Sequence, residues 1–168
     1  MSEPGPEAGI ESFWRLARRH CDLETVPGYF GPSARESVTP PAWSFGATAA
    51  HADELLALVL DGAKTATASA LWDYEAEDEP LPEPGALSIV LDSHGVPRAL
   101  LETTAVEVRP FDEVDAEHAR LEGEGDRSLT QWREAHERFF TDHGASGHDF
   151  TADMPVVLER FVVRYAAE

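Results

Sequence analysis

The sequence contains a single cysteine, Cys21, and no apolar run long enough to span a bilayer. One cysteine excludes an internal disulfide framework, which predicts a chain suited to a reducing, cytoplasmic setting. The opening segment, 1–9, has neither the apolar core nor the basic start of a secretory signal. We therefore expect a disordered tail at 1–9 and no membrane as a partner.

Motifs for metal ions and nucleotide cofactors are also missing. The sequence has no HExxH, no paired CxxC, no EF-hand loop, no P-loop and no GxGxxG turn. His143 and His148 flank a glycine-containing loop, but their spacing matches none of these sites. The sequence thus predicts neither a metal site nor a cofactor.

Basic residues are scarce, because 13 Lys and Arg stand against 32 Asp and Glu, which gives a formal net charge of −19. Proteins that bind nucleic acid without sequence preference do so mainly by neutralising phosphates with Lys and Arg. The acidic balance therefore disfavours DNA or long RNA as a partner. It leaves a small ligand, or a short RNA bound by a local basic patch, and solubility alone also explains the acidity.

The chain has 168 residues, of which 42% are hydrophobic, so we expect a single domain over 10–168. Apolar spacing predicts helices at 10–24, at 49–61 and after Ser128, a short helix from Asp112 to near Gly123, a β-hairpin over 86–108 and a strand at 156–165. Asp112 and Ser128 are the expected helix caps. Because strands and helices do not alternate regularly, we predict an α+β fold. Its antiparallel-dominated, mixed sheet or small barrel has helices packed at its ends.

The segment 26–46 is rich in proline and glycine, which predicts a long loop. Its aromatic residues are Tyr29, Phe30, Trp43 and Phe45. They either bury themselves and hold the loop down or form a stacking platform. A weaker alternative makes this loop the docking surface of a protein-interaction adaptor.

The segment 62–69, Gly-Ala-Lys-Thr-Ala-Thr-Ala-Ser, follows the second expected helix and places Lys64 among hydroxyl groups. A lysine beside a threonine can fix an oxyanion or a phosphate, and a desolvated lysine can take a proton from a hydroxyl or water. The alternative is a strand edge with a solvated lysine. In a regular strand, residues three apart point to opposite faces. Lys64 and Thr67 therefore converge only if the chain turns or bulges near Ala66.

Other candidate residues each have a functional and a structural interpretation. Glu122 stands where the short helix should end, and a carboxylate there opposes the helix dipole. It is either a functional group or one more acid on an acidic surface. Trp72 and Tyr74 are spaced to share one face of a strand, either to stack on a base or to pack in the core. Arg127 and Arg133 either meet a phosphate or pair with surface carboxylates.

Several segments together resemble the activating-signal-cointegrator homology (ASCH) family. They are Phe-Gly at 45–46, Gly-Ala-Lys-Thr-Ala-Thr at 62–67, Glu-Pro-Leu-Pro at 79–82 followed by Gly85, and His-Ala-Arg-Leu-Glu-Gly-Glu-Gly-Asp-Arg-Ser-Leu at 118–129. The resemblance spans 43–165. The longer N-terminal region and the acidic segment 75–84 depart from the compact amidohydrolase branch of that family.

The resemblance implies a PUA-like β-barrel with a cleft for RNA or a modified nucleoside. Some members of the family remove the acetyl group from N4-acetylcytidine, and others cleave RNA. The catalytic lysine, threonine and glutamate of the amidohydrolase branch match Lys64, Thr67 and Glu122. Thr67 is then the nucleophile, and Lys64 takes its proton or stabilises the oxyanion. Glu122 shuttles the proton or orients a water molecule.

The residues expected to contact the ligand around this set are Thr65, Ser69, Trp72, Tyr74, Asp126, Arg127 and Ser128. The predicted function is hydrolysis of an acylated cytosine nucleoside, with a modified nucleoside or a short RNA as the partner. The alternative is a module that binds short RNA, or a ribonuclease, in the same cleft. Affinity for RNA phosphates would fall steeply with added salt.

Overall fold

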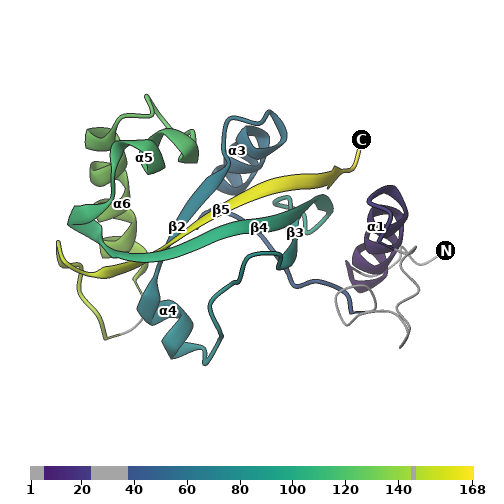
Figure 1. Cartoon of the computed structure of the whole chain (residues 1–168), viewed down its shortest axis with the longest axis horizontal. Helices are drawn as coiled ribbons and strands as arrows, with labels where there is room; N and C mark the ends of the chain where they lie inside the picture. Colours follow the sequence, from purple (N-terminus) through teal and green to yellow (C-terminus); the bar gives the residue numbers. More distant parts are fainter. Residues whose placement is uncertain (1–5, 24–37, 145–146) are drawn as a thin grey trace. The chain divides into compact units, whose positions relative to one another are not determined.

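The structure is a computed structural model that describes residues 6–23, 38–144 and 147–168 (Figure 1). The elements are α1 Pro6–His20, β1 Ala42–Trp43, α3 Ala49–Leu60, β2 Ala66–Ala70, α4 Leu71–Ala76, β3 Leu87–Leu91, β4 Pro97–Pro110, the 3-10 turn η1 Phe111–Glu113, α5 Ala116–Glu122, α6 Leu129–His143 and β5 Pro155–Ala166. The expected helices at 10–24 and 49–61, the hairpin and the last strand are present. Helix α1 begins at Pro6, four residues before the expected start.

The strands form one sheet in the order β1-β3-β4-β5-β2. Strand β1 runs parallel to β3, whereas β3 with β4 and β2 with β5 are antiparallel pairs. The expected α+β class with a mixed sheet is therefore confirmed. Among the described residues β1 and β2 end the strand order, so the sheet is open rather than closed into a barrel. Strand β1 has only two residues, and its register pairs it with β3 alone.

The described residues form two compact units. The first contains the described residues up to Leu60, with 85–102 and 162–168, and the second contains 61–84 and the described part of 103–161. Strands β4 and β5 each contribute residues to both units. All the catalytic and ligand-contacting residues expected from the sequence belong to the second unit.

In the first unit, helix α1 packs its apolar stripe against the hairpin of β3 and β4. Phe13, Trp14 and Ala17 recur at helical spacing and are buried together with Ile89 and Leu100. Ile89 and Leu100 are also partners in the antiparallel register. The helix is present as expected and Phe13 and Ala17 are buried, but Leu16, which follows the same helical spacing, is exposed, and Trp14 is buried instead.

The expected loop over 26–46 is described only from residue 38 onward, so Tyr29 and Phe30 lie outside the described residues. Within the described part, Trp43 belongs to β1, and its ring meets the ring of Phe45 edge to face at 4.5 Å. Phe45 is buried. At this position the aromatic residue is an anchor of the loop.

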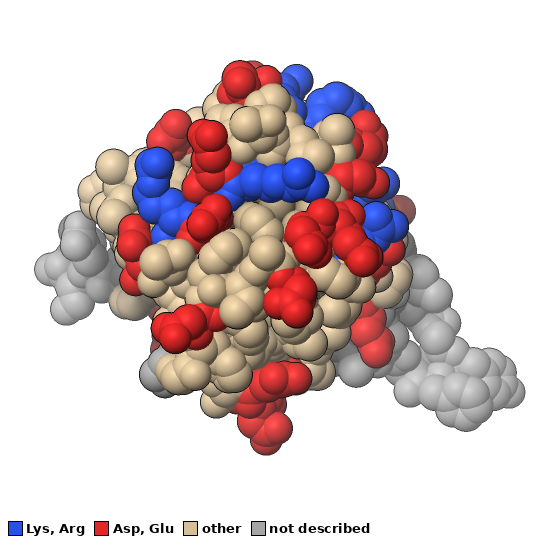
Figure 2. All heavy atoms as spheres, turned by 90° about the vertical axis from the view of Figure 1, so that its left-hand side faces the viewer, with Lys and Arg blue, Asp and Glu red and all other residues tan. Residues whose placement is uncertain are grey.

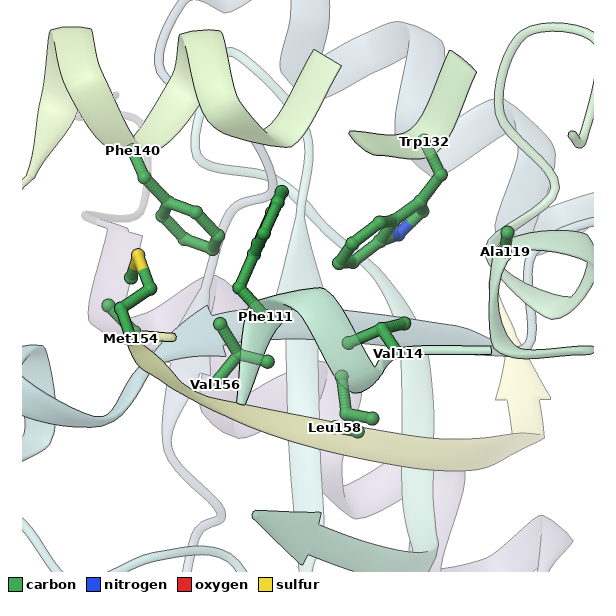
Figure 3. Close-up of a cluster of buried hydrophobic side chains, with 9 residues drawn as sticks. Phe111, Val114, Ala119, Trp132, Phe140, Met154, Val156 and Leu158 are labelled. Carbon is green, nitrogen blue, oxygen red and sulfur yellow. The ribbon is translucent and has the colours of Figure 1, made fainter. Parts of the chain in front are cut away.

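The core of the second unit lies between helix α6 and one face of strands β2 and β5 (Figure 3). Its buried side chains are Ala70, Phe111, Val114, Ala119, Trp132, Phe140, Met154, Val156 and Leu158. The rings of Phe111 and Trp132 stack at 5.2 Å. Ser128 caps α6, because its Oγ accepts a hydrogen bond from the backbone N–H of Gln131 at 3.1 Å, as the capping-box spacing predicts.

The segment around Trp72 and Tyr74 is a helix, not the strand that the sequence analysis expects. Helix α4 covers Leu71–Ala76, so these two side chains do not share a strand face. Trp and Tyr favour strands, but Leu, Glu and Ala in the same segment favour a helix, and an acidic residue, Asp73, stands in its first turn.

The N-cap of the short helix is Asp115 and not Asp112, so this sequence-based prediction is wrong. Asp112 belongs to η1, and its backbone N–H is bound by the carbonyl of Ala152. Asp115 caps α5 instead, because its Oδ1 accepts from the backbone N–H of His118 at 2.9 Å. Both aspartates have the right residue type, and the 3-10 turn decides which of them precedes the helix.

The surface follows the acidic composition. Figure 2 shows Asp and Glu side chains spread over one face, with a row of basic side chains between them. Several arginines are paired with carboxylates: Arg109 with Glu107 at 2.6 Å, Arg120 with Glu117 at 2.8 Å and Arg164 with Glu102 at 3.2 Å. In the part of the chain that the structure describes, none of the helices is long and apolar enough to cross a membrane.

Candidate functional site

The segment that carries Lys64 is held between the end of α5 and strand β5. The backbone N–H of Thr65 donates to the carbonyl of Leu121 at 2.8 Å, and the carbonyl of Thr65 accepts from Phe161 at 3.0 Å. The hydroxyl of Thr65 also reaches the Leu121 carbonyl, at 3.4 Å. Thr65, which we expected to touch a ligand, thus fixes the position of its neighbour Lys64.

A close approach at Gly123 brings Glu122 to the same place. Gly123 ends α5 with a φ of 71°, in the left-handed region that favours glycine. A Cβ atom at this position would lie only 2.2 Å from the carbonyl oxygen of Ala63. The missing side chain therefore lets the end of α5 pack directly on the segment before β2.

Lys64, the only lysine of the chain, is buried in the second unit with its ammonium group surrounded by acceptors. Its Nζ donates to Oε1 of Glu124 and to the carbonyl of Ala66, both at 2.9 Å. Oε2 of Glu122 lies 3.6 Å from the same Nζ, and the side chains of Lys64 and Glu122 are each 1% exposed. These partners only accept hydrogen bonds, so the arrangement suits a positively charged amine.

Glu122 is held by two histidines in addition to Lys64. Its Oε1 accepts from Nε2 of His118 at 2.8 Å, and its Oε2 lies 3.1 Å from Nε2 of His136. Burial alone would raise the pKa of Glu122. The charges of His136 and Lys64, with the hydrogen bonds from both histidines, outweigh burial and place this pKa well below 4.5. Glu122 is therefore a carboxylate at neutral pH.

The same groups include the described residues that can hold a metal ion. Glu122, Glu124 and His136 each offer one ligand atom, and these atoms lie within 4.8 Å of one another. The ammonium of Lys64 already lies 2.9 Å and 3.6 Å from two of these side chains. Lys64 thus supplies the positive charge that a metal ion would supply there.

The tip of Lys64 lies at the free edge of the sheet. Strand β2 ends the strand order, so only one of its sides faces another strand, β5. Because the carbonyl of Thr65 points to β5, the next carbonyl, that of Ala66, points away from β5. The Ala66 carbonyl accepts the hydrogen bond of Lys64. The ammonium therefore sits beside the start of β2, on the side away from β5, and the Lys64 side chain is almost fully buried there.

Thr67 lies on the face of β2 that is turned away from the core. Ala66, Ala68 and Ala70 alternate with it, and Ala68 and Ala70 pack on the core under α6. The register with β5 runs without a break from Ala66 to Ala70 and pairs Thr67 with Glu159. There is no bulge near Ala66. The structure thus brings Lys64 and Glu122 together, whereas Thr67 stands opposite Glu159 of β5.

A second polar group lies opposite Thr67, and its acid, Glu159, is absent from the sequence-based predictions. Glu159 accepts a hydrogen bond from the hydroxyl of the buried Thr103 at 2.6 Å. Burial raises the pKa of Glu159, and the hydrogen bond from Thr103 offsets only part of this rise. Beside this group is a hollow of about 210 Å³, which is lined by Ser69, Asp73, Tyr74, Glu77 and Glu79. Burial also raises the pKa of Tyr74.

The other expected ligand contacts have structural partners. The ring of Trp72 stacks on the imidazole of His148 at 4.5 Å. Asp126 accepts from the backbone N–H of Ser128 at 2.8 Å, and hydrogen bonds from the side chain and the backbone of Ser128 lower the pKa of Asp126. Arg127 donates to the carbonyl of Ala63 at 3.3 Å. Ligand binding by these residues stays a prediction, as does binding by Thr65 and Ser69.

Sequence reasoning missed His136 and Glu159, and it gave no role to Glu124. A signal for His136 was present, because it follows Trp132 by four residues on the apolar stripe of α6, where a polar side chain needs a partner. Glu159 has no such signal. It stands in an apolar strand, and only the register of β2 on β5 places it beside Thr67.

Comparison with known proteins identifies the family. A model of the ASCH domain matches residues 41–165. A crystal structure of the ASCH domain from Lactobacillus crispatus JV V101 is 33% identical, covers 94% of this chain and 97% of its own, and has a TM-score of 0.76. The crystal structure of protein EF3133 from Enterococcus faecalis V583 is also 33% identical, over 92% of this chain and 87% of its own, with a TM-score of 0.78. No curated protein matches the sequence. The chain belongs to the ASCH domain family and has its PUA-like fold.

Proposed function

We propose that this protein binds a modified nucleoside and hydrolyses an acyl group from the exocyclic amine of a cytosine base, with N4-acetylcytidine as the type substrate. The observation that carries the proposal is the buried pair of Lys64 and Glu122 at the free edge of β2. Membership in the ASCH domain family supports a ligand related to RNA. The net charge of −19 favours a small nucleoside over a polyanion.

Lys64 supplies the positive charge for the reaction. Hydrolysis of an amide passes through a tetrahedral intermediate whose oxygen becomes negative, and a fixed cation next to that oxygen stabilises it. The ammonium of Lys64 is held by the Ala66 carbonyl and by Glu124. Because these groups keep it charged, Lys64 acts as the cation of the site and not as its base.

Glu124 covers the ammonium of Lys64 and must move aside when the substrate binds. It is the partner of Lys64 that reaches solvent, with 21% of its side chain exposed, whereas Glu122 is buried. Gly123 and Gly125 on either side of it both have positive φ values, 71° and 57°. The acyl oxygen of the substrate takes the position of Glu124 Oε1. Lys64 therefore keeps a hydrogen-bond acceptor when Glu124 moves away.

Thr67 is the proposed nucleophile. Its Oγ1 forms a bond to the acyl carbon, the bond from that carbon to the base nitrogen breaks, and the nitrogen leaves with a proton as the free amine. Water then hydrolyses the threonine ester and releases the acid. Glu159, paired with Thr67 across the strands, takes the hydroxyl proton and delivers it to the leaving nitrogen, since its raised pKa suits reversible transfer.

The test incubates purified protein with N4-acetylcytidine and measures the released cytidine by chromatography. Lys64→Met removes the cation, and we expect a loss of about 100-fold or more. Thr67→Val keeps the shape and removes the hydroxyl, so it should abolish turnover. Arg120→Met is the matched control, because it removes one exposed positive charge elsewhere in the same unit. Absence of turnover by the wild type, or equal rates for the wild type and Lys64→Met, would contradict the proposal.

A second candidate function is binding or cleavage of a short RNA, and one observation supports it. A hollow of about 460 Å³ in the second unit is lined by Arg109, Arg160 and His118, among others. Arginines in a hollow suit a phosphate, although Arg109 already pairs with Glu107. This candidate predicts that affinity for a short single-stranded RNA falls with salt and with Arg160→Met. Affinity that is flat in salt would exclude it.

A further inference from the structure

His136 lies between two groups that only accept hydrogen bonds. It stands on α6 and is buried in the second unit. Its Nδ1 is 2.9 Å from the carbonyl oxygen of Trp132, and its Nε2 is 3.1 Å from Oε2 of Glu122. A neutral imidazole has one N–H and cannot donate to both. Either His136 carries two ring protons, or Glu122 carries a proton.

The other partners of Glu122 decide between these states. His118 donates to Oε1 of Glu122 at 2.8 Å, and the ammonium of Lys64 lies 3.6 Å from Oε2. A cation and a further donor around one carboxyl group favour its ionised form. The second proton therefore belongs to His136.

The surroundings of the His136 ring favour a positive charge as well. Burial alone would lower the pKa of His136, but the charge of Glu122, the hydrogen bond to it and the charge of Glu124 together raise this pKa above 6.5. The imidazole stacks on the indole of Trp132 with ring centroids 4.2 Å apart and planes 19° apart. An aromatic face attracts a cation.

The charges of the group then balance. Two cations, Lys64 and His136, face two carboxylates, Glu122 and Glu124. If His136 lost its second proton, one ring nitrogen would present a lone pair to an acceptor, either the Trp132 carbonyl or Oε2 of Glu122, and the buried group would carry one excess negative charge. Both effects would push the carboxylate of Glu122 from its place beside Lys64.

We propose that His136 is a positioning residue of the site: an imidazolium, held by the Trp132 carbonyl, whose charge keeps Glu122 ionised and directed at Lys64. The groups that act on it are Glu122 from α5, Glu124 from the following loop and the Trp132 carbonyl of its own helix, while His118 and Lys64 bind the same carboxylate of Glu122. The charge state of His136 stands on this geometry alone. Its consequence for catalysis rests on the proposed function.

Nuclear magnetic resonance of protein labelled with ¹⁵N-histidine and ¹³C-lysine tests the charge state directly. Lys64 is the only lysine, so its side chain gives one signal that needs no assignment. We expect both ring nitrogens of His136 to be protonated at neutral pH. We also expect the Lys64 signal to move with the midpoint of His136 as the pH rises. Either ring nitrogen of His136 unprotonated at neutral pH, or a Lys64 signal that does not respond to this titration, would overturn the proposal.

Two variants separate the charge from the hydrogen bonds. His136→Gln keeps a donor near the position of Nε2 and removes the charge, whereas His136→Asn keeps a donor near Nδ1 and loses the contact with Glu122. His94→Gln, at an exposed turn of the first unit, is the control. We expect the Lys64 signal of His136→Gln to lose the titration step that the wild type and His94→Gln retain. Retention of that step in His136→Gln would contradict the proposal.

The kinetic consequence has its own readout. If N4-acetylcytidine is turned over, kcat of the wild type falls as the pH rises through the midpoint of His136. His136→Gln should lower kcat about tenfold or more with little change in KM, and should lose this alkaline decline. An unchanged pH profile would show that His136 has only a structural role. If the wild type does not turn the substrate over, the proposed function fails, and the spectra still decide the charge state.

Discussion

The ammonium of Lys64 lies 3.6 Å from the carboxylate of Glu122, and both side chains are almost fully buried. Removing two charges from water costs more than the pair commonly returns, so a buried ion pair is weak evidence for a purely stabilising role. Buried charged groups with shifted pKa values, such as Glu122, are instead frequent at binding and catalytic sites. The two histidines on Glu122 and the Ala66 carbonyl on Lys64 hold this pair in one geometry.

Removal of the ammonium alone should destabilise the protein strongly. Lys64→Met leaves Glu122 and Glu124 without their shared cation, and we expect a loss of about 3 to 5 kcal/mol in the free energy of unfolding. Urea denaturation followed by circular dichroism measures it. A loss no larger than that of the exposed variant Arg120→Met would show that the buried charge is not a stabilising partner.

The double variant Lys64→Met with Glu122→Gln should recover much of this stability. It removes both charges of the pair and leaves His136 with Glu124, so no net charge stays buried. Activity should stay lost, because no cation remains for the oxyanion. Stability and turnover measured on the same preparations would separate the two roles. Recovery of turnover along with stability would contradict the assignment of Lys64.

The free energy of unfolding should depend on pH through Glu122 and His136. The pKa of Glu122 lies well below 4.5 in the folded chain, so its contribution is present above 4.5 and is lost as the pH falls through the folded pKa. The pKa of His136 lies above 6.5, so its contribution is complete below 6.5 and is lost as the pH rises through the folded pKa. These two groups therefore stabilise the fold most between pH 4.5 and pH 6.5.

Denaturation curves collected across this range check the dependence. The difference between the wild type and His136→Gln should be largest below 6.5 and should shrink as the pH rises, because the variant has no charge to lose. A difference that stays constant with pH would mean that His136 does not titrate in the way described.

Gly123 should tolerate no side chain. Gly123→Ala brings a Cβ to 2.2 Å from the Ala63 carbonyl oxygen at a φ of 71°. Gly62→Ala is the matched control, because its φ of 80° carries the same backbone strain and nothing lies within 4 Å. We expect about 1 to 2 kcal/mol for the strain at Gly62 and about 1 to 3 kcal/mol more at Gly123. Equal losses by thermal denaturation would show that the packing at Gly123 is loose.

Glu159→Gln should raise stability at neutral pH. Burial raises the pKa of Glu159, so its contribution to stability is complete below 4.5 and is lost as the pH rises through the folded pKa. Glutamine keeps an oxygen that accepts from Thr103 and does not ionise. The variant should match the wild type in acid, exceed it at neutral pH and lose turnover. A variant that is less stable at neutral pH would contradict this account of Glu159.

Local signals in the sequence predict much of this fold. The cap at Ser128, the apolar stripe of α6 and the hairpin of β3 and β4 depend on neighbours in the chain, and all are present. Contacts between segments that are far apart in the sequence are harder to predict. The meeting of Lys64 and Glu122 was expected only from the family resemblance, because nothing in the spacing of 62–69 and 118–129 shows that Gly123 packs on Ala63.

For a similar reason, the sequence could not predict which side chains of the site lie next to one another. The rule that residues three apart diverge on a strand applies only within β2, Ala66–Ala70, and Lys64 precedes that strand. It did not reveal that β2 is an edge strand, where the Ala66 carbonyl is open to Lys64. Glu159 enters the site only through the register of β5, and His136 only because α6 packs on α5.

In the proposed reaction the ammonium of Lys64, at the free edge of β2, meets the acyl group of the ligand. Titration of ¹³C-lysine-labelled protein with N4-acetylcytidine, followed through the signal of its single lysine, measures this contact, with uridine as the control ligand. The Lys64 signal should shift and saturate with N4-acetylcytidine and stay in place with uridine. A Lys64 signal that does not move at saturating N4-acetylcytidine would rule this contact out.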